Sequence, residues 1–256
     1  MATLGTVYQT ELIKSKNTFA LWLACLGAGF MPALMFVVYL TKWETFVPQK
    51  GANSWNQFSF ANFQGVSFFF IPFFVVLLCS LVMNIEHKSN TWKYLLTLPV
   101  SRLSIYVNKL SIILTLTVLT YVLFIVFLLA AGVVLGILRP KLGFLDQTLA
   151  LDGLLKLAFR SFVSTLAMLA IHYWLSIRLK NMIAAIGVGL ICIVTATILF
   201  KRWEYAIYYP YTFTMYTIFS SDKSVKVLAS HELYSLGYFV VITIAGYIDF
   251  SRFYKG

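Results

Sequence analysis

The chain has 256 residues, of which 60% are hydrophobic and only 11% are charged, and its 20 Lys and Arg outnumber its 9 Asp and Glu. Soluble domains carry about 25% charged residues, so this composition excludes a soluble protein with a polar surface and predicts an all-α, polytopic membrane protein. The basic residues lie in short segments between apolar runs, as those flanking membrane helices do, which disfavours a nucleic-acid-binding protein.

Residues 1–17 precede the first long apolar run. Leu4, Val7, Tyr8 and Leu12 recur at helical spacing, which predicts an amphipathic helix that lies in the membrane interface. A disordered tail is the alternative. Because the apolar run that follows is too long for the hydrophobic region of a signal peptide, we expect it to be retained as the first membrane span.

Six apolar runs are long enough to cross a bilayer, because about 20 residues rising 1.5 Å each span a hydrocarbon core of about 30 Å. They lack the alternation of barrel strands, so we expect six transmembrane helices. The third run is the longest and must tilt or project from the bilayer. The predicted spans are residues 18–41, 63–83, 110–138, 154–177, 181–200 and 233–250.

Two segments between the spans are rich in aromatic residues. Residues 42–62 are expected to form an interfacial loop. Residues 201–232 are too polar to span and too apolar for water, and we expect an outer re-entrant segment whose short helices dip into the outer leaflet. A plain aromatic belt at headgroup level fits this composition equally well.

The distribution of Lys and Arg favours a topology in which both termini are cytoplasmic. In that topology the inner segments carry the basic residues at a higher density than the outer ones, as the positive-inside rule requires. The inner segments are residues 1–17, 84–109, 178–180 and 251–256.

Ionisable residues in the spans are candidates for function, but three of them have a structural explanation. Arg160 can extend its side chain to the outer interface. His172 is expected to make a satisfied polar contact near the inner end of the fourth span. Asp249 lies three residues before Arg252, which predicts a local ion pair.

The fifth span contains small residues four positions apart, Ala185 and Gly189. This spacing permits close contact between helices in lipid. The partner helix could belong to the same chain or to a second chain.

The sequence contains none of the motifs that mark catalytic or metal sites. It has no G-x-x-x-x-G-K-[ST] loop for phosphates, no zinc motif and no nucleophile elbow. The three cysteines, Cys25, Cys79 and Cys192, lie in apolar runs without metal-site spacing. We therefore expect no catalytic residue, no metal and no cofactor in this chain.

The segment between the second and third spans is the most informative. Ser89 or Asn90 can cap a short helix over residues 86–99, and Ser101 can cap the helix that continues into the third span. The short helix would expose an apolar ridge, which suits the groove of a partner protein or the membrane surface. The ridge residues, at i, i+3, i+4 and i+7, are Trp92, Leu95, Leu96 and Pro99.

This segment resembles the ABC-2 family of ATP-binding-cassette permeases. In that family a Glu after the second span precedes a short coupling helix, a Leu and Pro pattern, a Ser-Arg pair and a Lys that opens the third span. Tyr209-Pro210-Tyr211 is similar to the bacitracin and lantibiotic immunity permeases. The residues that match the coupling motif are Glu86, Thr91, Leu95, Leu96, Pro99, Ser101, Arg102 and Lys109.

The resemblance implies a permease in a bacterial cytoplasmic membrane that pairs with a second permease, identical or related, and with ATPase subunits that hold ATP and Mg²⁺. It further implies export or expulsion of amphipathic peptides, antibiotics or lipid-like molecules. The residues implied to couple to the ATPase subunit are Glu86, Thr91, Trp92, Leu95, Leu96, Pro99 and Arg102.

Two other classes of membrane protein, a secondary transporter or channel and an intramembrane enzyme, fit the residues less well. A secondary transporter or channel usually places polar groups near the middle of the membrane, and here Arg160 and His172 are both off-centre. An intramembrane enzyme needs a nucleophile and a base within hydrogen-bond reach, and no such pair can be named.

Overall fold

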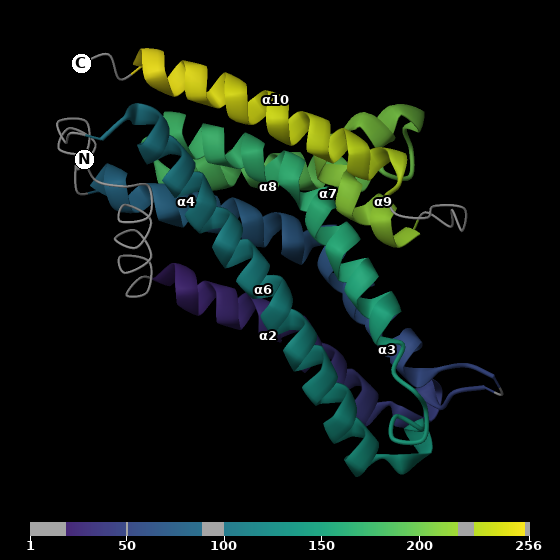
Figure 1. The fold of residues 1–256 in the computed structure, drawn as a ribbon. Coiled ribbons are helices and arrows are strands. Elements are labelled where there is room, and N and C mark those ends of the chain that lie inside the picture. Colours follow the sequence, from purple (N-terminus) through teal and green to yellow (C-terminus); the bar gives the residue numbers. More distant parts are fainter. Residues whose placement is uncertain (1–18, 50, 89–99, 220–227, 254–256) are drawn as a thin grey trace.

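The computed structural model describes residues 19–49, 51–88, 100–219 and 228–253, and every regular element within them is helical. Six helical stretches of this described part are long and apolar enough to cross a bilayer, which confirms the predicted all-α polytopic architecture (Figure 1). The longer helices are α2 (Phe19–Thr41), α3 (Ser54–Gly65), α4 (Ile71–Lys88), α6 (Arg102–Leu138), α7 (Leu151–Arg178), α8 (Met182–Leu199) and α10 (Ser230–Phe253).

Short turns of helix connect these elements. They are η1 (Trp43–Phe46), the π-turn η2 (Val66–Phe70), η3 (Pro140–Leu142), η4 (Glu204–Tyr208), η5 (Pro210–Thr212) and the helix α9 (Phe213–Phe219). The amphipathic helix predicted for residues 1–17 lies outside the described residues, as does the part of the predicted coupling helix that follows Lys88.

The second spanning stretch is longer than the predicted span. It begins at Ser54, passes through η2 without a break and ends at Lys88. Asn53 caps its start, because the Asn53 side chain accepts hydrogen bonds from the backbone N–H groups of Trp55 and Asn56. The expected loop over residues 42–62 is therefore wrong from Ser54 onward.

Two hydrophobic cores lie along α6. The first half of α6 packs with α4, α7, α8 and α10 around residues such as Tyr106 and Ile113. The second half packs with α2, α3 and the start of α7 around Phe124 and Leu135. The 37 residues of α6 measure about 55 Å at 1.5 Å per residue, which exceeds a hydrocarbon core of about 30 Å. In Figure 1 the second half of α6 accordingly extends away from α8 and α10, together with α2, α3 and the start of α7.

The tip at the end of α6 is closed by hydrogen bonds between distant parts of the chain. The Trp55 indole donates to the carbonyl of Phe144 at 2.8 Å, and the Asn53 amide donates to the carbonyl of Thr148 at 3.0 Å. These bonds join the start of α3 to the connection between α6 and α7, so the tip is an ordered cap rather than a free loop.

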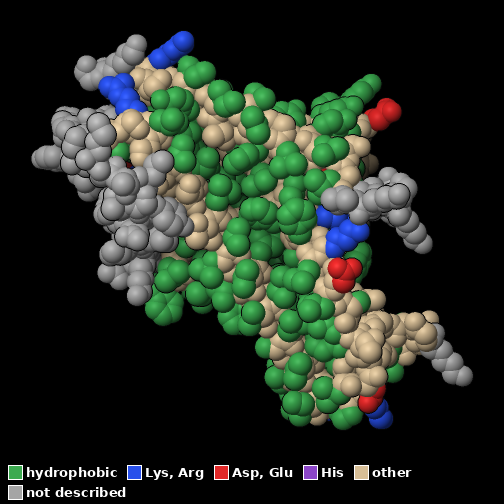
Figure 2. All heavy atoms as spheres, in the orientation of Figure 1, with side chains coloured by type: hydrophobic (Ala, Val, Ile, Leu, Met, Phe, Trp, Pro, Cys, Tyr) green, Lys and Arg blue, Asp and Glu red, His purple; other side chains and the backbone are tan. Residues whose placement is uncertain are grey.

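Hydrophobic side chains cover much of the face seen in Figure 2, and the charged side chains lie toward its ends and margins. Large apolar side chains of α8 and α10 are exposed within the chain, including Ile191 at 68% and Val241 at 66%. A surface of this kind is stable in contact with lipid, because it offers no groups that need water.

The small residues of α8 face the interior of the bundle. Ala185 is fully buried, and a Cβ placed on Gly189 would lie 2.5 Å from Cγ1 of Val76 in α4 and 2.9 Å from Cε1 of His172 in α7. Gly189 therefore packs against helices of the same chain, and its lack of a side chain permits that approach.

Replacing Gly189 with Leu is expected to destabilise the bundle by about 1–3 kcal/mol or more, because the new side chain must displace α4 or α7. The measurement is the melting temperature of the purified chain in detergent. Gly187→Leu is the matched control, since a Cβ on Gly187 meets nothing within 4 Å. Equal melting temperatures for the two variants would contradict the packing argument.

Candidate functional site

Four helices meet at the end of the bundle where α4 stops and α6 starts. The His87 ring, near the end of α4, donates from Nε2 to the carbonyl of Ser176 in α7 at 2.9 Å. Arg102, the first residue of α6, donates to the carbonyl of Ser251 in α10 at 2.8 Å. The two ends that flank residues 89–99 are thereby attached to the ends of α7 and α10.

The start of α6 is fixed by a cap that the sequence predicted. The Ser101 hydroxyl accepts a hydrogen bond from the backbone N–H of Ser104 at 3.1 Å, and Ser101 has an extended backbone. This confirms the predicted cap. The cap sets the residue at which the chain enters α6, and so it directs Arg102 toward α10.

A buried ion pair joins α4 to α6 at the same end. Nζ of Lys109 lies 2.7 Å from Oε1 of Glu86, and the two residues are only 3% and 1% exposed. Taking two charges out of water is costly unless the geometry and further hydrogen bonds compensate. The short distance provides strong mutual attraction, so this pair holds the end of α4 close to the first turns of α6.

A second ion pair at this end joins α7 to α10. Nε of Arg178 lies 2.9 Å from Oδ2 of Asp249, and the Trp174 indole donates to the same oxygen at 2.9 Å. The predicted local pair between Asp249 and Arg252 is therefore wrong. Asp249 faces α7, where it receives a charged and a neutral donor from one helix face.

The described part of the chain thus places Glu86, Arg102 and Lys109 in one polar region at the inner end predicted from the sequence. The other proposed coupling residues, Thr91, Trp92, Leu95, Leu96 and Pro99, lie outside the described residues. Sequence reasoning missed Arg178 and His87 as members of this region, because their contacts depend on which helices are neighbours.

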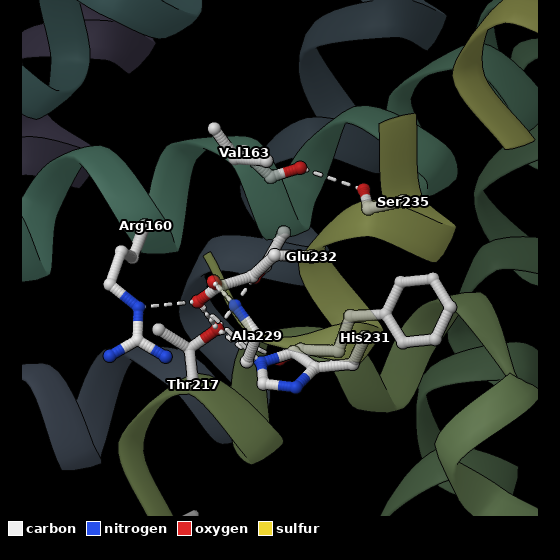
Figure 3. A network of polar contacts seen from close by, with 9 residues as sticks. Arg160, Val163, Thr217, Ala229, His231, Glu232 and Ser235 are labelled. Carbon is white, nitrogen blue, oxygen red and sulfur yellow. Dashed lines mark hydrogen bonds and ion pairs between the residues drawn. The ribbon is translucent and has the colours of Figure 1, made fainter. Parts of the chain in front are cut away.

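A separate polar network lies where α7, α9 and α10 meet (Figure 3). Nε of Arg160 lies 2.8 Å from Oε1 of Glu232, whose other oxygen accepts from the backbone N–H of Ala229 at 2.6 Å. The Thr217 hydroxyl lies 3.2 Å from Nε2 of His231. Arg160 is thus paired with a buried carboxylate at the start of α10, and its extension toward the outer interface stays a prediction.

One local signal could have identified Glu232. An acidic residue three positions after the start of a helix often accepts from an orphan backbone N–H there, and Glu232 does so at Ala229. Nothing in the sequence points to Arg160 as its ionic partner.

His172 contacts the segment after α8. The Tyr211 hydroxyl lies 2.7 Å from Nε2 of His172, and both side chains are buried. Burial raises the pKa of the Tyr211 phenol, which therefore stays neutral in this hydrogen bond with the imidazole. Nδ1 of His172 has no hydrogen-bond partner among the described atoms. The hydrogen bond expected for His172 is therefore found at Nε2 only.

The described part of the aromatic outer segment divides into two. Trp203, Tyr205 and Tyr208 are about half exposed, whereas Tyr211 and Phe213 are buried. A belt of exposed rings accounts for the first group only. Whether the segment dips into a leaflet stays a prediction.

Within the described ranges, no group of three or more His, Cys, Asp or Glu could hold a metal ion. At both ends of the bundle, charged side chains form ion pairs between neighbouring helices.

The comparison with protein families gives one match. A family model described as ABC-2 family transporter protein matches residues 7–197 of the 256. The match includes α2 to α8, and therefore both helices that the Glu86 and Lys109 pair joins. No curated protein and no solved structure matches the chain significantly.

Proposed function

The chain belongs to the ABC-2 family of transporter proteins and is therefore a membrane permease of an ABC transporter. We propose that it moves amphipathic molecules outward and that a separate subunit hydrolyses the ATP. The observation that carries this proposal is the buried ion pair between Glu86 and Lys109, which joins the two helices flanking residues 89–99. The six spanning stretches are those of a multi-pass membrane protein.

Coupling would proceed through the segment that residues 86–102 form between α4 and α6. Closure of the ATPase dimer around ATP and Mg²⁺ displaces this segment. The Glu86 and Lys109 pair makes α4 and α6 move together. The bonds of His87 to α7 and of Arg102 to α10 carry the displacement to two more spans.

The proposed substrates are amphipathic peptides, antibiotics or lipid-like molecules, as in the bacitracin and lantibiotic immunity permeases. Tyr209-Pro210-Tyr211 supports this branch, and so does the apolar character of the spans, which offers little to a strongly polar solute. Family membership disfavours the secondary transporter, the channel and the intramembrane enzyme that the residues alone left open.

The proposed assembly holds two permease chains, identical or related, and two ATP-binding-cassette subunits in a bacterial cytoplasmic membrane. Purification of the tagged chain in mild detergent tests it, with mass measurement of the intact complex. We expect a bound ATPase and two permeases. A stable particle with a single permease and no ATPase would rule the assembly out.

The proposed topology has both termini in the cytoplasm and residues 201–232 outside. A cysteine introduced by Ser221→Cys should react with a membrane-impermeant thiol reagent in intact cells, because this segment precedes the last span. Reaction that requires broken cells would reverse the orientation. The parent chain, with its three cysteines in spans, is the control.

A further inference from the structure

An apolar groove of about 280 Å³ lies between α2, the π-turn η2 with the start of α4, and the middle of α6. This volume is at the lower end of that of small-molecule sites, about 300–1,000 Å³. The side chains that form its walls include Leu26 and Phe30 of α2, Phe70 and Phe74 of the second stretch, and Thr120 and Phe124 of α6.

The π-turn contributes aromatic rings to the groove. It interrupts the regular α-helical pattern between Val66 and Phe70, and π-turns occur often at functional sites. The Phe70 ring contacts that of Phe30 with centroids 4.9 Å apart, and the Phe69 ring stacks on that of Phe73 with centroids 5.2 Å apart. Large rings therefore make up much of the wall, beside the small residues Gly27 and Ala28 of α2.

The polar groups of the groove already have partners. The hydroxyls of Thr117 and Thr120 each donate to a carbonyl of α6 at 2.8 Å, and the Tyr121 hydroxyl lies 3.0 Å from the Ser161 hydroxyl. A water molecule in a cavity needs two to four polar partners. The threonine hydroxyl protons are already used and the rest of the lining is almost entirely hydrocarbon, so the groove favours an apolar occupant.

The groove opens toward the bilayer. Leu26, Phe30 and Phe69 are 63%, 49% and 39% exposed within the chain, and all three belong to spanning stretches. An empty groove at this depth would forfeit the dispersion contacts of its walls. The lipid acyl chains of the bilayer are the material that can enter the groove from its exposed side. We propose that the groove binds one acyl chain of a bilayer phospholipid, which enters between α2 and α4.

A helix from a second copy is a poorer occupant. Helices that pack closely in lipid use small residues at the contact. The small residues of this wall are already covered by the chain itself, because a Cβ on Gly27 would lie 3.0 Å from the Phe74 ring and Ala28 is buried. An acyl chain is thin and flexible, so it fits among the rings without moving them.

A photoreactive lipid tests the proposal on the full chain without any ATPase, so the result is independent of the coupling mechanism. The chain is reconstituted in vesicles of phosphatidylethanolamine and phosphatidylglycerol, with a small fraction of phosphatidylethanolamine that carries a diazirine in the middle of one acyl chain. After illumination, labelled positions are mapped by mass spectrometry. We expect about tenfold more labelling at residues 69–74 than at Ile191 and Val241, although these two side chains are the more exposed, a ratio equivalent to 1.4 kcal/mol.

Two variants on α2 make the test specific. Leu26→Trp places a larger side chain in the groove and should reduce labelling of residues 69–74 to the level at Ile191. Leu34→Trp is the matched control, because Leu34 is also exposed on α2 but does not line the groove, and it should leave the labelling unchanged.

Two results would overturn the proposal. One is even labelling of all lipid-facing positions in the parent chain, which means that lipid only surrounds the protein. The other is a disulfide between two chains on oxidation of a Leu26→Cys variant, when the parent, which retains Cys25, stays single. That result would place a second copy over the groove.

Discussion

Replacing Glu86 with Gln is expected to lower the stability of the bundle by about 3 kcal/mol, the usual cost of removing one partner from a buried ion pair. Gln keeps the shape of the side chain but removes its charge. The Lys109 ammonium then loses the carboxylate that lies 2.7 Å away, at a position where Lys109 is only 3% exposed. The melting temperature of the purified chain should fall accordingly.

A double-mutant cycle separates the ion pair from other effects of the substitution. The double variant Glu86→Gln, Lys109→Gln should be more stable than the sum of the single changes predicts, because it removes both charges of the same contact. Glu44→Gln is the surface control, since Glu44 is exposed. Additive effects at Glu86 and Lys109 would show that the pair does not hold α4 to α6.

Leu95→Asp is expected to release the ATPase subunit or to uncouple its ATP turnover from transport. The proposed ridge of Trp92, Leu95 and Leu96 seats in a groove of that subunit, and an unpaired carboxylate in such a contact is strongly disfavoured. The spans are unchanged, so expression and membrane insertion should stay near those of the parent. Pull-down of the ATPase and ATP hydrolysis in reconstituted vesicles measure the effect.

Thr97→Asp is the matched control for this variant. On a helix with 100° per residue, Thr97 lies about 200° from Leu95 and away from the ridge, so the same carboxylate should be tolerated there. Parental ATPase binding and substrate-dependent turnover in Leu95→Asp would refute the coupling assignment. Retained ATPase with weaker membrane attachment would instead indicate that the ridge lies on lipid headgroups.

The sequence predicted those features that depend on neighbours along the chain. The six spans follow from run length and composition, and the Ser101 cap follows from a hydroxyl placed before an apolar helix. The Asn53 cap is equally local, but the aromatic residues around it favoured an interfacial loop. The start of the second spanning stretch was therefore placed too late.

The ion pairs could not be predicted, because they depend on which helices become neighbours. Arg160 and Glu232 are 72 residues apart, and Arg178 and Asp249 are 71 apart. A local partner such as Arg252 is the better choice for Asp249 when only spacing is known. Packing of α10 on α7 reverses that choice, because it brings a guanidinium and an indole to the same carboxylate.

The length of α6 makes it a lever. α6 leaves the first hydrophobic core after Leu116 and enters the second at Phe124. The point about which α6 would pivot therefore lies in its middle, beside the apolar groove. A rod of about 55 Å that turned by about 5° around this point would move each of its ends by about 2.5 Å, in opposite directions. In the proposed coupling mechanism, a push applied near Lys109 would therefore reach the cap around Trp55 as a swing in the opposite direction, with no change in the helix itself.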